Sequence, residues 1–222
     1  MPVPEPRASS STPRAVAVSG VLFASLYIAS LILIRTAAPA DPADPGAWLT
    51  NPTMRGWIRL ALNLVPFAGL AFLWFMAVLR DRIGLREDRL LATVFLGSGL
   101  MFVVMLFIAV AVAQGMLDAF GIDGRLPSDS DAYRVARGTA YALMQTFGLR
   151  MAAVFMFVTS TIGLRTSVFS RWISYLGFVC GLCLLLVVTH LPWLALVFPA
   201  WVLTVSIYLL VVRSEPIAAA SR

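Results

Sequence analysis

The sequence has few of the residues that soluble enzymes use for chemistry. It contains one histidine, two cysteines and 11 acidic residues, and all 17 of its cationic side chains are arginine. Only 13% of the 222 residues are charged and 60% are hydrophobic, which is unlike the composition of a soluble domain. The short supply of nucleophiles and metal ligands argues against an enzyme, so we expect no catalytic residue and no cofactor.

Acidic residues are also absent from the long apolar runs of the sequence. Carriers coupled to protons or sodium commonly hold a carboxylate near the membrane midplane, so this absence argues against such a carrier. The single histidine, His190, stands before Leu191-Pro192 between two apolar runs. We expect it to have a structural role in a tight turn, and we expect no metal site.

Long hydrophobic runs dominate the rest of the chain and predict an all-α bundle of six transmembrane helices. The predicted spans cover residues of about 15–34, 57–79, 90–113, 139–163, 172–189 and 193–212. Each would rise roughly 27 to 38 Å, enough to cross a hydrocarbon core of about 30 Å. Residues 14–213 then form one membrane domain between a disordered N-terminal tail, 1–13, and a short C-terminal tail, 214–222.

The arginines predict the orientation of these spans. With the N-terminus inside, ten arginines outside the spans face the cytoplasm and five face outward, so both chain ends are predicted in the cytoplasm. The net charge of +6 then reflects topology and does not indicate nucleic-acid binding. Ala38-Pro39-Ala40 resembles a cleavage site, so the first span could alternatively be a leader, although it exceeds the usual leader core of roughly 7 to 15 residues.

The most informative polar residue within a predicted span is Arg150. If its helix starts near Thr139, Arg150 lies roughly 16 Å from the outer edge, where a charge costs about 2.5 to 3.5 kcal/mol. Gln145 on the same span, Asn63 on the second and Tyr27 on the first are predicted at similar depth. Together with a carbonyl freed by a proline on the second span, these side chains predict a polar layer in the outer half.

Two interpretations of this polar layer remain open. Arg150 could bond to carbonyl and amide groups of neighbouring helices and fix their packing. Alternatively, a cation with no carboxylate nearby could receive an anionic ligand, such as a lipid head group or a small organic acid. The second interpretation, like any carrier function, requires a cavity beside Arg150.

One stretch of the fifth span combines Gly177 and Gly181 with Cys180 and Cys183. The Gly-x-x-x-Gly spacing allows close helix approach, within the chain or with a partner protein. The cysteines form a Cys-x-x-Cys pattern, but an apolar position lacks the positive charge that makes a thiol reactive. We interpret the cysteines as small packing residues.

The second half of the chain resembles a known family. The segment from Tyr141 to Leu164, followed by Ser170-Arg171-Trp172-Ile173-Ser174-Tyr175-Leu176-Gly177 and a last span with Pro199, is similar to bacterial membrane proteins grouped as domain of unknown function 4386. The resemblance implies a six-helix protein of a bacterial inner membrane and implies no activity. We therefore expect a binding or structural role in the lipid bilayer, with a small-molecule carrier or an accessory subunit of a membrane complex as alternatives.

Overall fold

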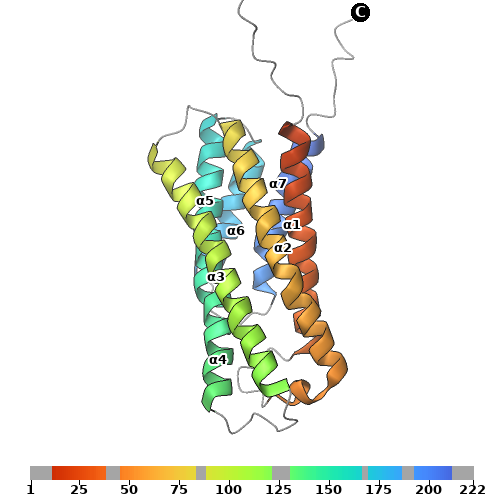
Figure 1. The fold of residues 1–222 in the computed structure, drawn as a ribbon. Helices are drawn as coiled ribbons and strands as arrows, with labels where there is room; N and C mark the ends of the chain where they lie inside the picture. Colours follow the sequence, from red (N-terminus) through yellow and green to blue (C-terminus); the bar gives the residue numbers. More distant parts are fainter. Residues whose placement is uncertain are drawn as a thin grey trace, which may run out of the picture.

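The computed structural model describes residues 12–38, 46–83, 89–121, 131–166, 170–186 and 193–211, and nearly all of them are helical. The α-helices are α1 (Thr12–Ala37), α2 (Pro52–Ile83), α3 (Arg89–Gly121), α4 (Asp131–Tyr141), α5 (Leu149–Thr166), α6 (Arg171–Leu186) and α7 (Val197–Val211). Two short 3₁₀ turns, η1 (Ala47–Thr50) and η5 (Leu194–Leu196), precede α2 and α7. A π-helical segment, η4 (Ala142–Gly148), joins α4 to α5. Figure 1 shows the helices as one elongated bundle.

Five of the described helical segments are long and apolar enough to cross a membrane. They cover Ala17–Ala37, Pro52–Asp81, Arg89–Ala119, Asp131–Thr166 and Leu194–Val211. Helix α6 has 16 residues, which rise about 24 Å and fall short of a hydrocarbon core of about 30 Å. The chain is therefore a helical integral membrane protein, while the sixth span remains a prediction.

Four helical segments are longer than the spans predicted for them: α1, α2, α3 and the continuous run from α4 to α5. Helix α3 runs on to Gly121, and α4, η4 and α5 follow one another without a break from Asp131 to Thr166. Hydropathy marks only the part of a helix that lies among apolar groups, whereas backbone hydrogen bonds continue into the charged turns at either end. The helical structure of 131–138 matters for the candidate site.

Large hydrophobic side chains cover the outside of the bundle. Trp74 is 71% exposed, Phe67 62% and Val179 60%. A continuous apolar surface of this kind marks a protein that is covered by a partner or by lipid. On a bundle whose helices are long enough to span a bilayer, it is the surface that faces the lipid chains.

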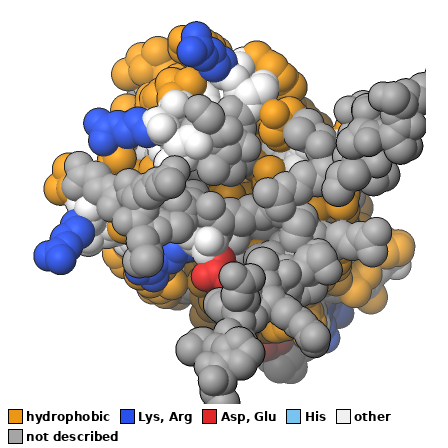
Figure 2. Space-filling view, turned by 90° about the horizontal axis from the view of Figure 1, so that it is seen from above, with side chains coloured by type: hydrophobic (Ala, Val, Ile, Leu, Met, Phe, Trp, Pro, Cys, Tyr) orange, Lys and Arg blue, Asp and Glu red, His pale blue; other side chains and the backbone are white. Residues whose placement is uncertain are grey.

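The end of the bundle that carries the chain termini is lined by arginines. Helix α1 begins and α7 ends at the upper end in Figure 1. Arg80, Arg89, Arg165 and Arg171 lie at helix termini at this end and are exposed. Figure 2 looks onto this end and shows basic side chains spaced around its rim.

Phenylalanine rings from five helices pack together in the middle of the bundle. The ring centroid of Phe72 on α2 lies 4.8 Å from that of Phe23 on α1, 5.4 Å from Phe102 on α3, 5.2 Å from Phe155 on α5 and 5.6 Å from Phe198 on α7. These rings, which we call the central cluster, are tilted or edge-to-face to Phe72, the favoured geometries for aromatic pairs. The central cluster therefore fixes five helices relative to one another.

A smaller hydrophobic cluster lies toward the end of the bundle opposite the chain termini. It contains Ala37, Trp48, Leu49, Ile58, Leu62, Met116, Leu117 and Tyr133, and we call it the end cluster. Beside it, Ser30 Oγ donates a buried 2.9 Å hydrogen bond to the carbonyl of Ala61 and joins α1 to α2. The end cluster thus ties η1 and the adjacent ends of α1, α2, α3 and α4 together.

Gly177 and Gly181 on α6 are buried against α5 of the same chain. A methyl group at residue 177 would overlap Ser160 Oγ and lie 2.9 Å from Trp201 Nε1. At residue 181 it would lie 3.3 Å from the carbonyl oxygen of Ala153. Small residues permit this close helix approach, and the face that they form is already occupied within the chain.

Replacing Phe72 by alanine is expected to destabilise the bundle by about 2 to 3 kcal/mol through the cavity left in the central cluster. Lipid is as apolar as this core, so the loss is one of packing contacts and not of burial from water. The free energy of unfolding in mixed micelles with increasing dodecyl sulfate measures it. Phe67→Ala, on the lipid-facing side of the same helix, is the matched control and should change the value by less than about 0.5 kcal/mol. Equal losses in the two variants would contradict the role of the central cluster.

Candidate functional site

A cavity of about 140 Å³ lies between the central cluster and the end cluster. Leu31 on α1 and Val65 on α2 line it, eight and seven residues along their helices from Phe23 and Phe72. Such a separation is about 11 Å along a helix axis. The cavity is therefore about two helical turns from the middle of the bundle, toward the end opposite the chain termini.

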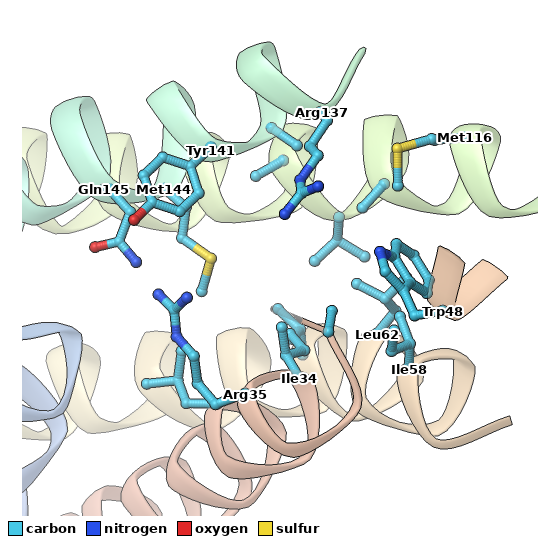
Figure 3. Close-up of a pocket in the computed structure, with 17 residues that line it drawn as sticks. Ile34, Arg35, Trp48, Ile58, Leu62, Met116, Arg137, Tyr141, Met144 and Gln145 are labelled. Atoms are coloured by element: carbon cyan, nitrogen blue, oxygen red, sulfur yellow. The ribbon is translucent and has the colours of Figure 1, made fainter. Parts of the chain in front are cut away.

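Most of the lining is apolar, and five polar side chains interrupt it. The apolar part includes Leu31, Ile58, Leu62, Met116 and Met144, and the polar residues are Arg35, Trp48, Arg137, Tyr141 and Gln145. Figure 3 shows the guanidinium groups of Arg35 and Arg137 entering from opposite sides, one from α1 and the other from α4. None of the described lining residues is acidic. A largely apolar pocket with a few polar groups is the usual construction of a small-molecule site.

Helical spacing brings the polar residues to the cavity. Arg137, Tyr141 and Gln145 follow one another at intervals of four residues, so they share one face of the α4–η4 segment. Leu31 and Arg35 are related in the same way on the last turns of α1. Gln145 belongs to the π-helical η4, and π-helical turns are frequent at functional sites.

Trp48 is positioned by a short turn before α2. Gly46 has a φ of 82°, a left-handed conformation that glycine adopts without steric cost, and the 3₁₀ turn η1 follows it. Asn51 then caps α2, because its side-chain oxygen accepts a 2.9 Å hydrogen bond from the backbone N–H of Thr53. Pro52 occupies the first helical position, where its missing N–H is no loss. These local signals hold Trp48 at the wall of the cavity.

Tyr133 orients Arg137 from within the end cluster. The guanidinium carbon of Arg137 lies 6.0 Å from the centroid of the Tyr133 ring. Arg137 Nη1 also donates a 3.2 Å hydrogen bond to the Tyr133 hydroxyl. Tyr133 is only 2% exposed, and a cation over such a ring contributes about 0.5 to 2 kcal/mol. The end cluster thereby holds Arg137 in place beside the cavity.

The indole nitrogen of Trp48 is a buried hydrogen-bond donor. Trp48 is 7% exposed, and its Nε1 has no acceptor among the described residues. Figure 3 shows this nitrogen on the edge of the ring that is turned toward the cavity. A buried donor without an acceptor costs about 1 to 3 kcal/mol, so an acceptor within the cavity would be stabilised there.

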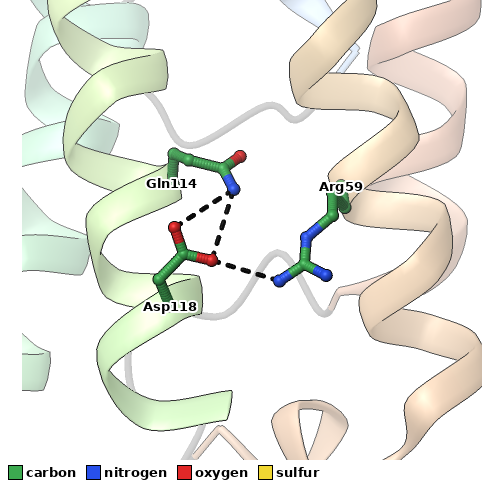
Figure 4. A network of polar contacts seen from close by, with 3 residues as sticks. All are labelled: Arg59, Gln114 and Asp118. Carbon is green, nitrogen blue, oxygen red and sulfur yellow. Dashed lines mark hydrogen bonds and ion pairs between the residues drawn. The ribbon is translucent and has the colours of Figure 1, made fainter. Parts of the chain in front are cut away.

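A separate polar contact joins α2 to α3 outside the cavity. Arg59 Nη2 lies 3.1 Å from Asp118 Oδ1, and Gln114 Nε2 lies 3.4 Å from each carboxylate oxygen of Asp118 (Figure 4). The side chains of Arg59 and Asp118 are 57% and 54% exposed, and an exposed ion pair of this kind contributes about 0 to 1 kcal/mol. The carboxylate of Asp118 is therefore engaged by Arg59 and not by an arginine of the cavity.

The four residues of the predicted polar layer do not converge in the structure. Gln145 lines the cavity, whereas Tyr27, Asn63 and Arg150 do not. Tyr27 is 1% exposed and stacks on Phe23 of the central cluster, with ring centroids 5.5 Å apart. Asn63 is exposed on α2, because each helical residue turns by about 100° and Asn63 points away from the face that carries Leu62. Equal depth in the membrane did not place these side chains on facing surfaces.

Arg150 is half-buried near the start of α5 and bonds within its own helical segment. Its Nη1 donates a 3.4 Å hydrogen bond to the carbonyl of Thr146 in η4. Arg150 does not line the cavity. The candidate anion site therefore moves from Arg150 to Arg35 and Arg137.

Arg35, Arg137 and Trp48 were not found from the sequence because all three lie outside the predicted spans. Arginines near span ends were interpreted only as topology signals. The four-residue spacing of Arg137, Tyr141 and Gln145 is the signal that could have found the site. It becomes usable once the helix is known to begin at Asp131.

The other chemically active residue types offer no competing site in the part of the chain that the structure describes. No group of three or more histidine, cysteine, aspartate or glutamate residues there could hold a metal ion. Cys180 and Cys183 are free thiols on α6. His190 lies outside the described residues.

The class of the protein follows from its fold and cavity alone. No family model, curated protein or solved structure matches the chain. The resemblance of its second half to the family of domain of unknown function 4386 remains a hypothesis. The chain is a helical integral membrane protein. At one end of its bundle it has a small cavity that is lined mainly by apolar side chains and by two arginines.

Replacing Arg150 by leucine is expected to leave the protein folded, with a change of less than about 1 kcal/mol in the free energy of unfolding. The only bond the variant is known to lose is the long one to Thr146, while removal of a charge from a span offsets that loss. Accumulation in the membrane and the unfolding midpoint in dodecyl sulfate measure the effect. A variant that does not accumulate would show that Arg150 has a larger packing role than this bond indicates.

Proposed function

We propose that this protein binds an anionic ligand in the cavity, in a non-enzymatic binding role. The observation that carries the proposal is the entry of two guanidinium groups, those of Arg35 and Arg137, into one largely apolar space from opposite sides (Figure 3). Two cations that face one cavity attract an anion to it. An anion between them gains charge-assisted hydrogen bonds.

The lining supports binding more than chemistry. Among the described lining residues there is no carboxylate, thiol or imidazole to act as a general base or nucleophile. The ligand can come from either of two sources with the same chemistry, a lipid head group or a free organic acid. Both present an oxyanion that arginine binds through paired hydrogen bonds.

Binding is favoured over the alternatives of transport and a subunit role. A carrier needs a path through the middle of the bundle, and the central cluster of phenylalanine rings fills that position. A subunit contact through Gly177 and Gly181 would compete with α5, which already covers both glycines. Neither transport nor a subunit role explains the cavity.

Arg137→Gln is expected to weaken anion binding by about 10-fold or more, because a hydrogen bond between charged groups contributes about 1.5 to 3 kcal/mol. The measurement is calorimetric titration of the full chain in nanodiscs of neutral phosphatidylcholine. Three anions serve as probes: inorganic phosphate, benzoate, and phosphatidylglycerol added to the nanodisc lipid. Arg35→Gln should have the same effect.

Arg134→Gln is the matched control for this experiment. Arg134 lies one turn before Arg137 on α4, forms an ion pair with Asp131, and its side chain is 68% exposed. This variant should bind as the unaltered chain does. The proposal fails if none of the three anions binds the unaltered chain, or if all three arginine variants bind equally well.

We also propose that the chain crosses the membrane six times, with both ends in the cytoplasm, and that the membrane is a bacterial inner membrane. The start of α1 and the end of α7 lie at the same end of the bundle. An even number of membrane crossings requires this arrangement. The arginines of the whole sequence outside the predicted spans, ten on the side of the chain termini against five on the other, support a cytoplasmic position for that end.

Reporters fused after Arg222 test this orientation. A green fluorescent protein fusion should fluoresce, and an alkaline phosphatase fusion should be inactive, because phosphatase folds only where disulfides form. Fusions of the same reporters after Gly121, at the opposite end of the bundle, should give the reverse result. Active phosphatase after Arg222 would place the C-terminus outside.

A further inference from the structure

We infer that the ligand of the cavity is a small organic acid with one negative charge and a compact apolar body, and that the Trp48 indole donates a hydrogen bond to its carboxylate. This inference rests on the proposed function and narrows it to one class of ligand. It follows from three independent properties of the cavity: its volume, its apolar walls and its buried donor.

The volume limits the size of the ligand. The cavity measures about 140 Å³, whereas pockets for drug-sized ligands usually measure roughly 300 to 1,000 Å³. An apolar cavity of about 150 Å³ is large enough to admit benzene. The part of the ligand that lies within the cavity is therefore about the size of one aromatic ring or a short branched chain.

The walls require an apolar body. Ile58, Leu62, Met116 and Met144 line the cavity together with the polar residues. A hydrated inorganic ion would leave these side chains facing water and would give up part of its own hydration beside them. An aromatic or branched body contacts them instead, and methionine sulfur packs favourably against aromatic rings.

The donors suit a carboxylate. Its two oxygens offer about four acceptor positions, and donors approach from three elements: Arg35 on α1, Arg137 on α4 and Trp48 beside α2. Trp48 Nε1 is a neutral donor, nine-tenths buried and without an acceptor among the described residues. Figure 3 shows it turned toward the same space as the two guanidinium groups. A carboxylate in this space would meet both positive charge and the neutral indole donor.

The first test compares ligands on the unaltered full chain in phosphatidylcholine nanodiscs. Benzoate should bind at least 10-fold more tightly than benzamide, which has the same ring without the charge. Benzoate should also bind at least 10-fold more tightly than inorganic phosphate, which has charge without an apolar body. Isothermal titration calorimetry measures the three affinities, and phosphatidylglycerol in the nanodisc lipid should not reduce benzoate binding.

The second test isolates the indole donor. Trp48→Phe keeps an aromatic wall and removes the N–H, and should weaken benzoate binding about 10-fold while the affinity for benzamide changes less. Trp57→Phe is the matched control, since Trp57 is 49% exposed and does not line the cavity. The unfolding midpoint of each variant shows whether it is folded, and the ligand comparison stands without any variant.

The possible outcomes separate this inference from the proposed function. If phosphate binds as tightly as benzoate, or if phosphatidylglycerol displaces benzoate, the inference of a small organic acid is wrong. The proposal of an anion site is still supported in that case. If benzamide binds as tightly as benzoate, the cavity is a site for apolar molecules and both proposals fail. If no anion binds, both proposals fail as well. Unchanged benzoate binding in folded Trp48→Phe overturns the role of the indole.

Discussion

The contact between Phe72 and the rings of four other helices is the interaction on which the rest of the structure depends. In lipid, helices do not associate to escape water, so close packing has to hold them. The central cluster sets the spacing and rotation of α1, α2 and α3 at the middle of the bundle. Two turns further along, the same helices form walls of the cavity, and the end cluster closes the far side. The cavity is the space between two well-packed regions.

The chemistry of the cavity comes from two arginines that line it. Arg59 and Arg134 also lie at this end, but each is more than half exposed and pairs with a carboxylate. Arg35 and Arg137 reach into a largely apolar cavity, and Tyr133 holds Arg137 there through its ring and its hydroxyl. The Trp48 indole, which lines the same cavity, adds a neutral hydrogen-bond donor to these two cations. Arginines that line a cavity are more typical of a binding site than of span ends that only set the topology.

The sequence predicted the helical membrane fold and one residue of the cavity, Gln145. Span lengths and composition were sufficient for the fold, because a bilayer imposes both on any helix that crosses it. The polar layer around Arg150 was built from depth alone, which says nothing about the direction of a side chain around its helix. Tyr27 and Asn63 illustrate the result: one is buried among aromatic rings and the other is exposed. Arg137 was missed because hydropathy began the predicted span at residue 139, two residues after Arg137, whereas the helix begins at Asp131.

By itself, the sequence determined that the chain is a helical membrane protein and which side chains are available for binding. Hydropathy and charge are properties of single residues and short segments, so they can be read without a fold. Only the tertiary structure decided which arginines share a space, because that depends on the rotation of four helical segments about their axes. The central cluster and the end cluster fix those rotations through contacts between residues far apart in the chain. They bring Arg35, Trp48 and Arg137 together, while Arg150 bonds within its own segment.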